Sequence, residues 1–416
     1  MDLERTIEKH SDQVDLIQVL KREKEKKRVK IPETGEKEVK TGKNKVYSIK
    51  VINGDGIGTI SAGGTKDIGE QIKKAIKISK INTGYQGLIK EPKNKSSALE
   101  KLGQDMHEPK IEEYIDKIEE AKKYEDKDTK IESAGLLYGH RKREYLDTFG
   151  NHEKYEKTSS SSWAKYLTDK KDKGTYFESE FSYKDPYSNF LENCEKASEK
   201  SKKQAHKKEE KGERNLVFRK GSLYMLLRYG LAYYFNAYRV NRGLSEIEIG
   251  QKIGPEDLKL LNSGTLKDGA KTNGFDREGT KKQETTLINN GEVKSYLHND
   301  YTSKLYNTSS TGNSASLSNR SIIKMDNTII EPGEGLGDRD IIIDRLTPNL
   351  DKSTGDYSFE VTTAWTEDGK GIKNFVFQGN LFEDLKELKI GKEKKKQRPG
   401  IRSPNLMLEG KEIEPK

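Results

Sequence analysis

The sequence is poor in cysteine and has no long apolar segment, and these absences restrict what the protein can be. Cys194 is the only cysteine among 416 residues, so no intramolecular disulfide can form, as is usual in a reducing compartment. Only 31% of the residues are hydrophobic, and the N-terminal MDLERTIEKHSDQVD has neither an apolar core nor a small-residue cleavage site. We therefore expect a soluble, cytoplasmic protein without a membrane segment.

The sequence also lacks the motifs of common catalytic sites. Its six histidines are scattered, and none has a second histidine and a glutamate at the helical spacing of a zinc peptidase. Cys194 lies in a predicted amphipathic helix, which favours packing over nucleophilic attack. The glycines of GDGIGTISAGG stand between two predicted strands, so we expect no phosphate-binding loop. The residue chemistry alone therefore indicates no catalytic site.

The charge is positive overall but mixed along the chain. Lys and Arg number 78 against 69 Asp and Glu, which gives a formal net charge of +9. Acidic and basic residues alternate, and the only dense basic runs are KREKEKKRVK (21–30) and KEKKKQR (392–398). We interpret these runs as solvated surface, because a nucleic-acid-binding protein needs a concentrated basic face. Nucleic acid is therefore not the expected partner.

The length predicts about two domains, and we place their boundary near residue 212. Residues 1–211 are predicted to form a mixed α/β domain with an antiparallel sheet. Its expected helices lie at 2–10, 68–81, 111–123 and 189–210, and its expected strands lie within 16–31, 45–64 and 129–183. Residues 212–416 are predicted to form a β-rich domain, either a sheet or barrel-like. The predicted fold class is α+β.

The β-rich domain is expected to contain one buried helix. Leu223, Leu226, Leu227 and Leu231 recur at the spacing of an apolar helical stripe. Arg228 lies at the centre of this short apolar run, which excludes a membrane span. Strand signals follow: an Asn-Gly hairpin turn at 290–291, a pair of strands within 322–335, and a strand, turn and return strand within 354–379.

Several motifs give the second half a family resemblance. They are FDREGT (275–280), LINNGEVKSYLHNDYTSKLYNTSSTGN (287–313), PGEG (332–335) and the segment 354–391. With these motifs the chain resembles the TldD/PmbA family, whose members were once named modulators of DNA gyrase. The resemblance covers 212–410 well and the first half more weakly, and 84–128 matches little. The family-motif residues are Phe275, Asp276, Glu278, Gly279, Ser310, Thr311, Gly312 and Asn313.

The resemblance also implies which branch of the family applies. In the TldD-like branch, a helix with H-E-x-x-x-H follows two leucines and binds zinc together with a later cysteine. Here Arg228, Tyr229 and Tyr233 stand at those three positions, and no cysteine follows Cys194. Arginine cannot act as a neutral ligand, and tyrosine offers no carboxylate base. The resemblance therefore implies the PmbA (TldE) branch without the zinc motif, and no cofactor in this chain.

The function implied is that of a non-catalytic subunit in a heterodimer. A TldD-like zinc metallopeptidase partner would cleave unfolded or leader-type peptides, and this chain would help to enclose them. Arg228 is expected to reach solvent in the chamber between the subunits or to pair with a carboxylate, with Tyr229 and Tyr233 beside it as peptide contacts. Two alternatives remain: a nucleic-acid-associated or gyrase-associated modulator, and an independent hydrolase with an unrecognised site.

Overall fold

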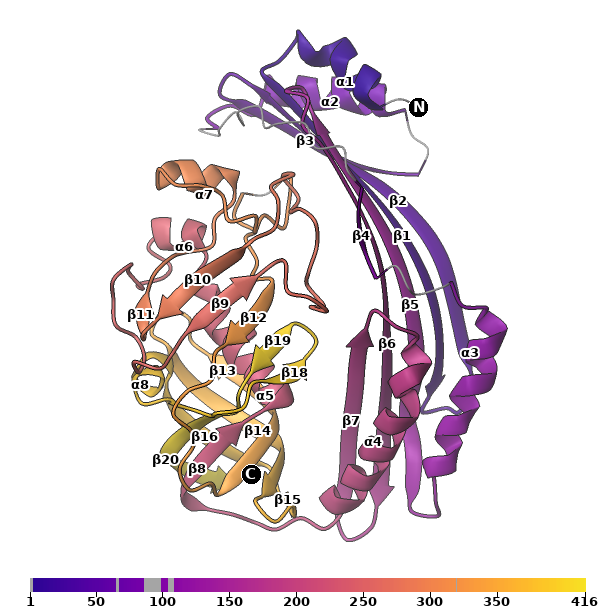
Figure 1. Ribbon diagram of the computed structural model, residues 1–416, viewed down its shortest axis with the longest axis vertical. Coiled ribbons are helices and arrows are strands. Elements are labelled where there is room, and N and C mark those ends of the chain that lie inside the picture. Colours follow the sequence, from indigo (N-terminus) through magenta and orange to yellow (C-terminus); the bar gives the residue numbers. More distant parts are fainter. Residues whose placement is uncertain (1–2, 65–66, 86–98, 104–107, 319) are drawn as a thin grey trace.

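The computed structural model describes residues 3–64, 67–85, 99–103, 108–318 and 320–416. The chain forms two strand-rich regions that lie side by side, and the long strands of the first arch along the second (Figure 1). This arrangement confirms the predicted α+β class, with an antiparallel sheet and helices before residue 212 and mainly strands after it. No helix within the described ranges is long and apolar enough to cross a membrane.

The first region is built on one sheet of seven strands in the order β3-β2-β1-β5-β6-β4, with β7 also paired to β6. Its strands are β1 (Leu16–Pro32), β2 (Glu38–Asn53), β3 (Gly56–Gly63), β4 (Leu99–Leu102), β5 (Thr129–Asp147), β6 (His152–Asp169) and β7 (Lys173–Ser182). β5 alone has 19 residues and spans about 60 Å at the usual rise per residue. The segment 129–147, which reads as two short strands in sequence, is therefore continuous.

Four helices cover one face of this sheet, which we call the outer face. They are α1 (Leu3–Ser11), α2 (Ile68–Ser79), α3 (Ile111–Ile118) and α4 (Phe190–Gln204). At one end α2 packs on Val19 and Val51, and at the other α3 and α4 pack around Val29 and Leu136. Cys194 lies on the buried side of α4, where burial raises the pKa of its thiol to about 12. The expected packing role of Cys194 is thereby confirmed.

The predicted helices differ from the structure mainly at their ends. α4 ends at Gln204 and not at residue 210, because the following charged residues carry no apolar stripe and the chain turns toward β8. The 111–123 helix is divided into α3 and a 3-10 segment, Glu119–Tyr124. Such differences at the last turn of a helix are ordinary.

The second region contains a six-stranded sheet and a closed barrel. The sheet has the order β11-β10-β9-β12-β19-β18, and the barrel closes because β13 pairs with both β8 and β14 in the order β13-β8-β20-β16-β14. The strands are β8 (Gly212–Phe218), β9 (Leu260–Ser263), β10 (Glu284–Asn289), β11 (Glu292–Val293), β12 (Asn327–Ile330), β13 (Ile341–Leu350), β14 (Asp356–Thr366), β15 (Gly371–Ile372), β16 (Phe375–Asn380), β17 (Lys389–Ile390), β18 (Lys395–Arg398), β19 (Ile401–Ser403) and β20 (Leu406–Pro415). The barrel-like prediction is confirmed.

The hairpin predicted at Asn290 and Gly291 is present, but the strand pair predicted within 322–335 is not. Asn290 and Gly291 both have positive φ, 53° and 70°, and they join β10 to β11 as a type I′ turn requires. Within 322–335, however, the structure has the single strand β12 and not a pair. β12 pairs with β9 and β19, which come from distant parts of the chain. The prediction of an adjacent partner was wrong for that reason.

The predicted buried helix keeps its apolar face but not its regular geometry. Leu223, Leu226, Leu227 and Leu231 are all at most 5% exposed, as the stripe predicts. The backbone passes from α5 (Lys220–Tyr224) through a π-helical turn, Met225–Gly230, to a 3-10 turn, Leu231–Tyr233. A π turn inserts an extra residue, so it rotates later side chains relative to earlier ones. The remaining short helices are α6 (Ala237–Asn241), α7 (Asp300–Leu305) and α8 (Leu381–Lys386).

Candidate functional site

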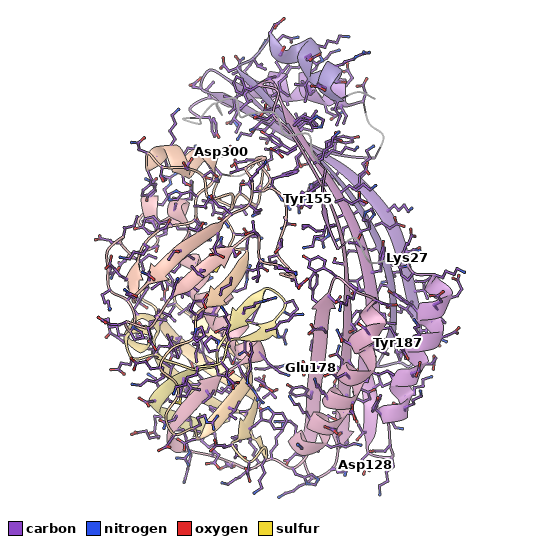
Figure 2. All side chains as sticks on the ribbon, in the orientation of Figure 1. Lys27, Asp128, Tyr155, Glu178, Tyr187 and Asp300 are labelled. Atoms are coloured by element: carbon purple, nitrogen blue, oxygen red, sulfur yellow. The ribbon has the colours of Figure 1, made fainter. Side chains whose placement is uncertain are left out.

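The FDREGT motif lies where the second region meets the first. The Phe275 ring is 1% exposed and packs against Tyr155 of β6 and Tyr145 of β5, with ring centres 5.0 and 6.5 Å apart. Gly279 has a φ of +76°, and a Cβ there would lie 2.4 Å from the Tyr145 ring. Only glycine therefore allows this close contact. In Figure 2 Tyr155 points from the sheet toward the second region.

Asp276 holds the motif in shape. Its carboxylate accepts backbone hydrogen bonds from Glu278 at 2.8 Å, Thr280 at 3.0 Å and Ser314 at 2.9 Å. A buried carboxylate with three N–H donors is a stable turn element and is not available to a substrate. Asp276 therefore orients its neighbours Arg277 and Glu278.

Glu278 forms a buried ion pair across the junction of the two regions. Its carboxylate lies 3.7 Å from the Lys50 ammonium of β2 and accepts the Asp300 backbone N–H at 3.0 Å. Burial and the neighbouring Asp300 carboxylate raise the pKa of Glu278 to about 7. A polar cavity of about 360 Å³ adjoins the pair, and Tyr85 and Arg320 also line it.

The Ser310–Asn313 loop encloses the backbone of His298. The Thr311 hydroxyl accepts the His298 N–H at 2.7 Å and donates to the His298 carbonyl at 3.0 Å. Gly312 has a φ of +71°, and the Ser310 hydroxyl accepts its N–H at 3.3 Å. Burial lowers the pKa of His298 to about 4, so the imidazole is neutral near pH 7. The loop is thus a tightly bonded structural element.

Asn313 belongs to a second polar cluster centred on Asp326. The Asn313 side-chain amide donates to Asp326 at 3.1 Å, and the Lys282 ammonium lies 2.7 and 2.8 Å from the two carboxylate oxygens. The Asp326 backbone N–H donates to the Asn262 side chain at 2.6 Å. The backbone carbonyl of Asp326 also accepts a hydrogen bond from Arg228.

Arg228 is partly buried, and its expected exposure to solvent in a chamber between subunits stays a prediction. Its guanidinium donates to the backbone carbonyl of Met325 at 2.7 Å and also to that of Asp326. The expected carboxylate pairing is replaced by these carbonyls, although the Asp326 carboxylate is near enough to favour the positive charge. Burial lowers the pKa of Arg228 nonetheless.

Tyr229 and Tyr233 occupy a different environment. The Lys352 ammonium lies 4.4 Å from the Tyr229 ring centre and 4.9 Å from that of Tyr233. Arg239 stacks on Tyr233 at 3.9 Å, and Tyr229 remains 41% exposed. The three positions therefore do not form one cluster, because Arg228 contacts 325–326 while the tyrosines contact Lys352. Their role as peptide contacts stays a prediction.

Strand alternation sorts the charges of the first sheet by face, which the linear sequence conceals. On the outer face acids and bases pair: Glu23 with Lys45 at 3.4 Å, Glu25 with Lys43 at 3.2 Å, and Glu144 with Lys21 at 3.2 Å. The acids of the basic run 21–30 thus lie on this face. The interpretation of that run as solvated surface stays a prediction for the other face, where Arg22 and Lys24 are half-buried.

The opposite face, which carries Leu20, Tyr145 and Tyr155 against Phe275, gathers cations. We define the inner cationic face by the residues that share this side of the sheet and by the arginine that approaches it from FDREGT: Arg22, Lys24, Arg141, Arg143, Lys157 and Arg277. In register, Arg22 lies opposite Arg143 and Lys24 opposite Arg141. Across the described residues, no carboxylate oxygen lies within 4.0 Å of any of these six cations.

Comparisons with known proteins agree with this architecture. A family model described as the PmbA/TldA metallopeptidase C-terminal domain matches residues 211–414. The second half of the chain therefore carries a domain of the PmbA/TldD type. An uncharacterised protein of Methanocaldococcus jannaschii is 33% identical over 232 residues, which are 52% of this chain and 55% of that protein. A metalloprotease of Methanothermobacter thermautotrophicus is 27% identical over 35% of this chain and 32% of its own length.

Solved structures extend the likeness in fold to nearly the whole chain. TldE from Thermococcus kodakarensis superposes with a TM-score of 0.88 at 19% identity, with 99% of each chain covered. A putative modulator of a DNA gyrase from Thermotoga maritima gives a TM-score of 0.85 at 16% identity, also with 99% of each chain covered. The match in sequence spans about half the length of the Methanocaldococcus jannaschii protein, whereas the likeness in fold to the solved structures covers nearly the whole chain.

The zinc site of the PmbA/TldD family does not fit the residues present here. At the positions that the resemblance assigns to ligands, the donors are a guanidinium already bonded to two carbonyls and two phenols. Within the described ranges no three His, Cys, Asp or Glu side chains group closely enough to hold a metal ion. Zinc sites in proteins need at least three such ligands. That this chain holds no zinc stays a prediction for metal analysis.

Several residues of the candidate site were missed in the sequence. Lys50, Lys282 and Asp326 acquire their roles only through contacts with distant segments, so no local signal indicates them. The inner cationic face does have a local signal. Reading 21–30 with the period of a strand places Arg22 and Lys24 on one side and Glu23 and Glu25 on the other.

Proposed function

We propose that the chain is a non-catalytic, TldE-like subunit of a PmbA/TldD metallopeptidase. A TldD-like partner holds the zinc and cleaves unfolded or leader-type peptides, and this chain helps to enclose them. The PmbA/TldD-type domain, the metalloprotease names of curated relatives and the likeness in fold to TldE support the proposal.

The bonding of Arg228 is the observation that carries the proposal. A permanently charged side chain occupies the position that the resemblance gives to the first zinc ligand, and carbonyls of 325 and 326 hold it inside the protein. Catalysis of peptide hydrolysis by a metal requires an open coordination position and a positioned base. Neither is supplied by Arg228, Tyr229 and Tyr233.

Reconstitution with a TldD-like subunit tests the proposal. The mixture is expected to cleave an unstructured peptide that neither subunit cleaves alone, and substitution of a zinc ligand in the partner is expected to abolish cleavage. Cleavage that persists after that substitution, or turnover by this chain alone with zinc, would contradict the proposal and favour an independent hydrolase. Metal analysis of the isolated chain is expected to show well below about one zinc per chain.

The second candidate is a nucleic-acid-associated modulator, as the gyrase name of one structural relative suggests for that protein. The inner cationic face favours this candidate, because unpaired cations are what phosphate binding requires. The next experiment therefore includes nucleic acid as a competing ligand.

A further inference from the structure

The inner cationic face concentrates positive charge that no carboxylate of the described residues neutralises within 4.0 Å. Arg22 and Arg143 lie opposite each other on β1 and β5, and Arg277 approaches both from the second region. Burial, together with the charges of Arg22 and Arg143, lowers the pKa of Arg277 to about 10. These arginines therefore repel one another in a half-buried setting.

Burial and neighbouring positive charges also lower the pKa values of the lysines on this face. Burial, together with the charges of Arg141 and Arg143, lowers the pKa of Lys157 to about 7. Burial, a contact with Lys26 and the charge of Arg141 lower the pKa of Lys24 to about 8. Neutral polar side chains would occupy these positions without repulsion. Lys157 is accounted for by its hydrogen bonds to the carbonyls of Ala270 and Thr272, whereas a bound anion explains the other cations better than stability does.

The spacing of the cations matches an extended chain. Arg22 and Lys24 of β1, and Arg143 and Arg141 of β5, are alternate residues of strands, so each pair is separated by about 6.6 Å along the strand. Alternate side chains of an extended peptide have the same separation. Guanidinium groups also bind carboxylates through paired hydrogen bonds.

The geometry points to the inner cationic face as a binding surface for an extended acidic peptide segment with carboxylates at alternate positions. This inference rests on the proposed function, because it assigns a charge preference to the peptide that the heterodimer encloses. The surface lies on the side of the sheet that faces the second region, beside the FDREGT junction.

A peptide fits this surface better than a nucleic acid. Proteins that bind single strands add aromatic side chains on which the bases stack. The rings beside the central arginines are those of Tyr155 and Phe275, and each is only 1% exposed. The Tyr155 hydroxyl also donates to Asn273 at 2.9 Å, which fixes the ring in the junction. Bases therefore have no stacking surface next to Arg143.

The test measures binding of a fluorescent ten-residue peptide of alternating Ser and Glu to the full chain. Matched peptides replace Glu by Gln or by Lys. The inner-face variant is Arg22→Gln with Arg143→Gln, and its control is Lys21→Gln with Lys142→Gln, which removes two positive charges from the outer face of the same strands. We expect the inner-face variant to bind the Glu peptide at least about tenfold more weakly, and the control to bind within about twofold of the original chain.

Three results would overturn the inference: equal binding of the Glu and Gln peptides, an equal loss of affinity in both double variants, or tighter binding of an oligothymidylate that displaces the Glu peptide. The last result would favour the nucleic-acid alternative. Thermal unfolding of each variant separates a folding defect from a binding defect. Because binding is measured without a partner, failed reconstitution with intact peptide binding would refute only the subunit proposal, and the reverse result would refute only this inference.

Discussion

Buried carboxylates of the second region are paired with basic side chains, whereas the cations of the inner cationic face have no carboxylate partner among the described residues. Asp326 is held by Lys282, Asp344 by Arg219, and Asp384 by Lys411. Arg22 and Arg143, in contrast, face each other across two strands without a carboxylate. Paired charges of this kind specify packing, while unpaired ones cost stability and leave binding capacity for a ligand. Each of the following changes tests that distinction.

The largest effect is expected for Asp344→Ala. This carboxylate is 1% exposed, lies 2.5 Å from Arg219, and accepts hydrogen bonds from Tyr176 at 2.7 Å and Trp365 at 2.9 Å. Its removal leaves a partly buried guanidinium and two buried donors unpaired, which should lower the free energy of unfolding by about 3–5 kcal/mol. Urea unfolding measures the loss. Asp368→Ala, at an exposed pair with Lys370, is the control and should leave stability nearly unchanged.

Arg228→Met should have the next largest effect. The substitution leaves the buried carbonyls of 325 and 326 without their donor, so we expect a loss of about 2 kcal/mol in the free energy of unfolding. Peptide turnover by the reconstituted heterodimer should be unchanged at a temperature where the variant is folded. A selective loss of turnover in a folded variant would show that Arg228 contacts the peptide after all.

The inner-face double variant, Arg22→Gln with Arg143→Gln, should be more stable than the original chain. Removing two repelling charges is expected to raise the free energy of unfolding by about 1 kcal/mol while peptide binding weakens. The outer-face double variant breaks the Lys21–Glu144 and Lys142–Glu156 pairs and should be neutral or slightly less stable. The free energy of unfolding is measured in urea at low salt. A lower value for the inner-face variant than for the original chain would contradict the comparison.

The smallest effect concerns the pH dependence of Glu278. Its pKa is raised to about 7 in the folded chain, so between the unfolded pKa and pH 7 the folded state holds a proton that the unfolded state has released. The contribution of Glu278 is therefore fully present below its unfolded pKa and is lost as pH rises through about 7. Unfolding curves at pH 5 and 7.5 should show a smaller difference for Glu278→Gln. An equal difference in both proteins would assign the effect to other groups.

Local patterns predicted much of the fold and little of the site. The order of helices and strands, the hairpin at Asn290 and the burial of Leu227 follow from short-range periodicity and turn chemistry. The partners of β12, the closure of the barrel and the π turn before Gly230 depend on contacts between distant segments. The hydrogen bonds of Arg228 have no local signal, because the carbonyls that accept them belong to residues almost one hundred positions later.

The unbroken register between β1 and β5 makes the inner cationic face sensitive to the insertion or deletion of a single residue. Fifteen consecutive residue pairs join the two strands without a bulge, so the side that each residue of β1 occupies depends only on whether its number is odd or even. Insertion or deletion of one codon at the start of β1 would bring Glu23 and Glu25 to the side now held by Arg22 and Lys24. The chemistry of this surface therefore depends on whether each cation of β1 has an even number, and a shift of one residue would replace its positive charges by negative ones.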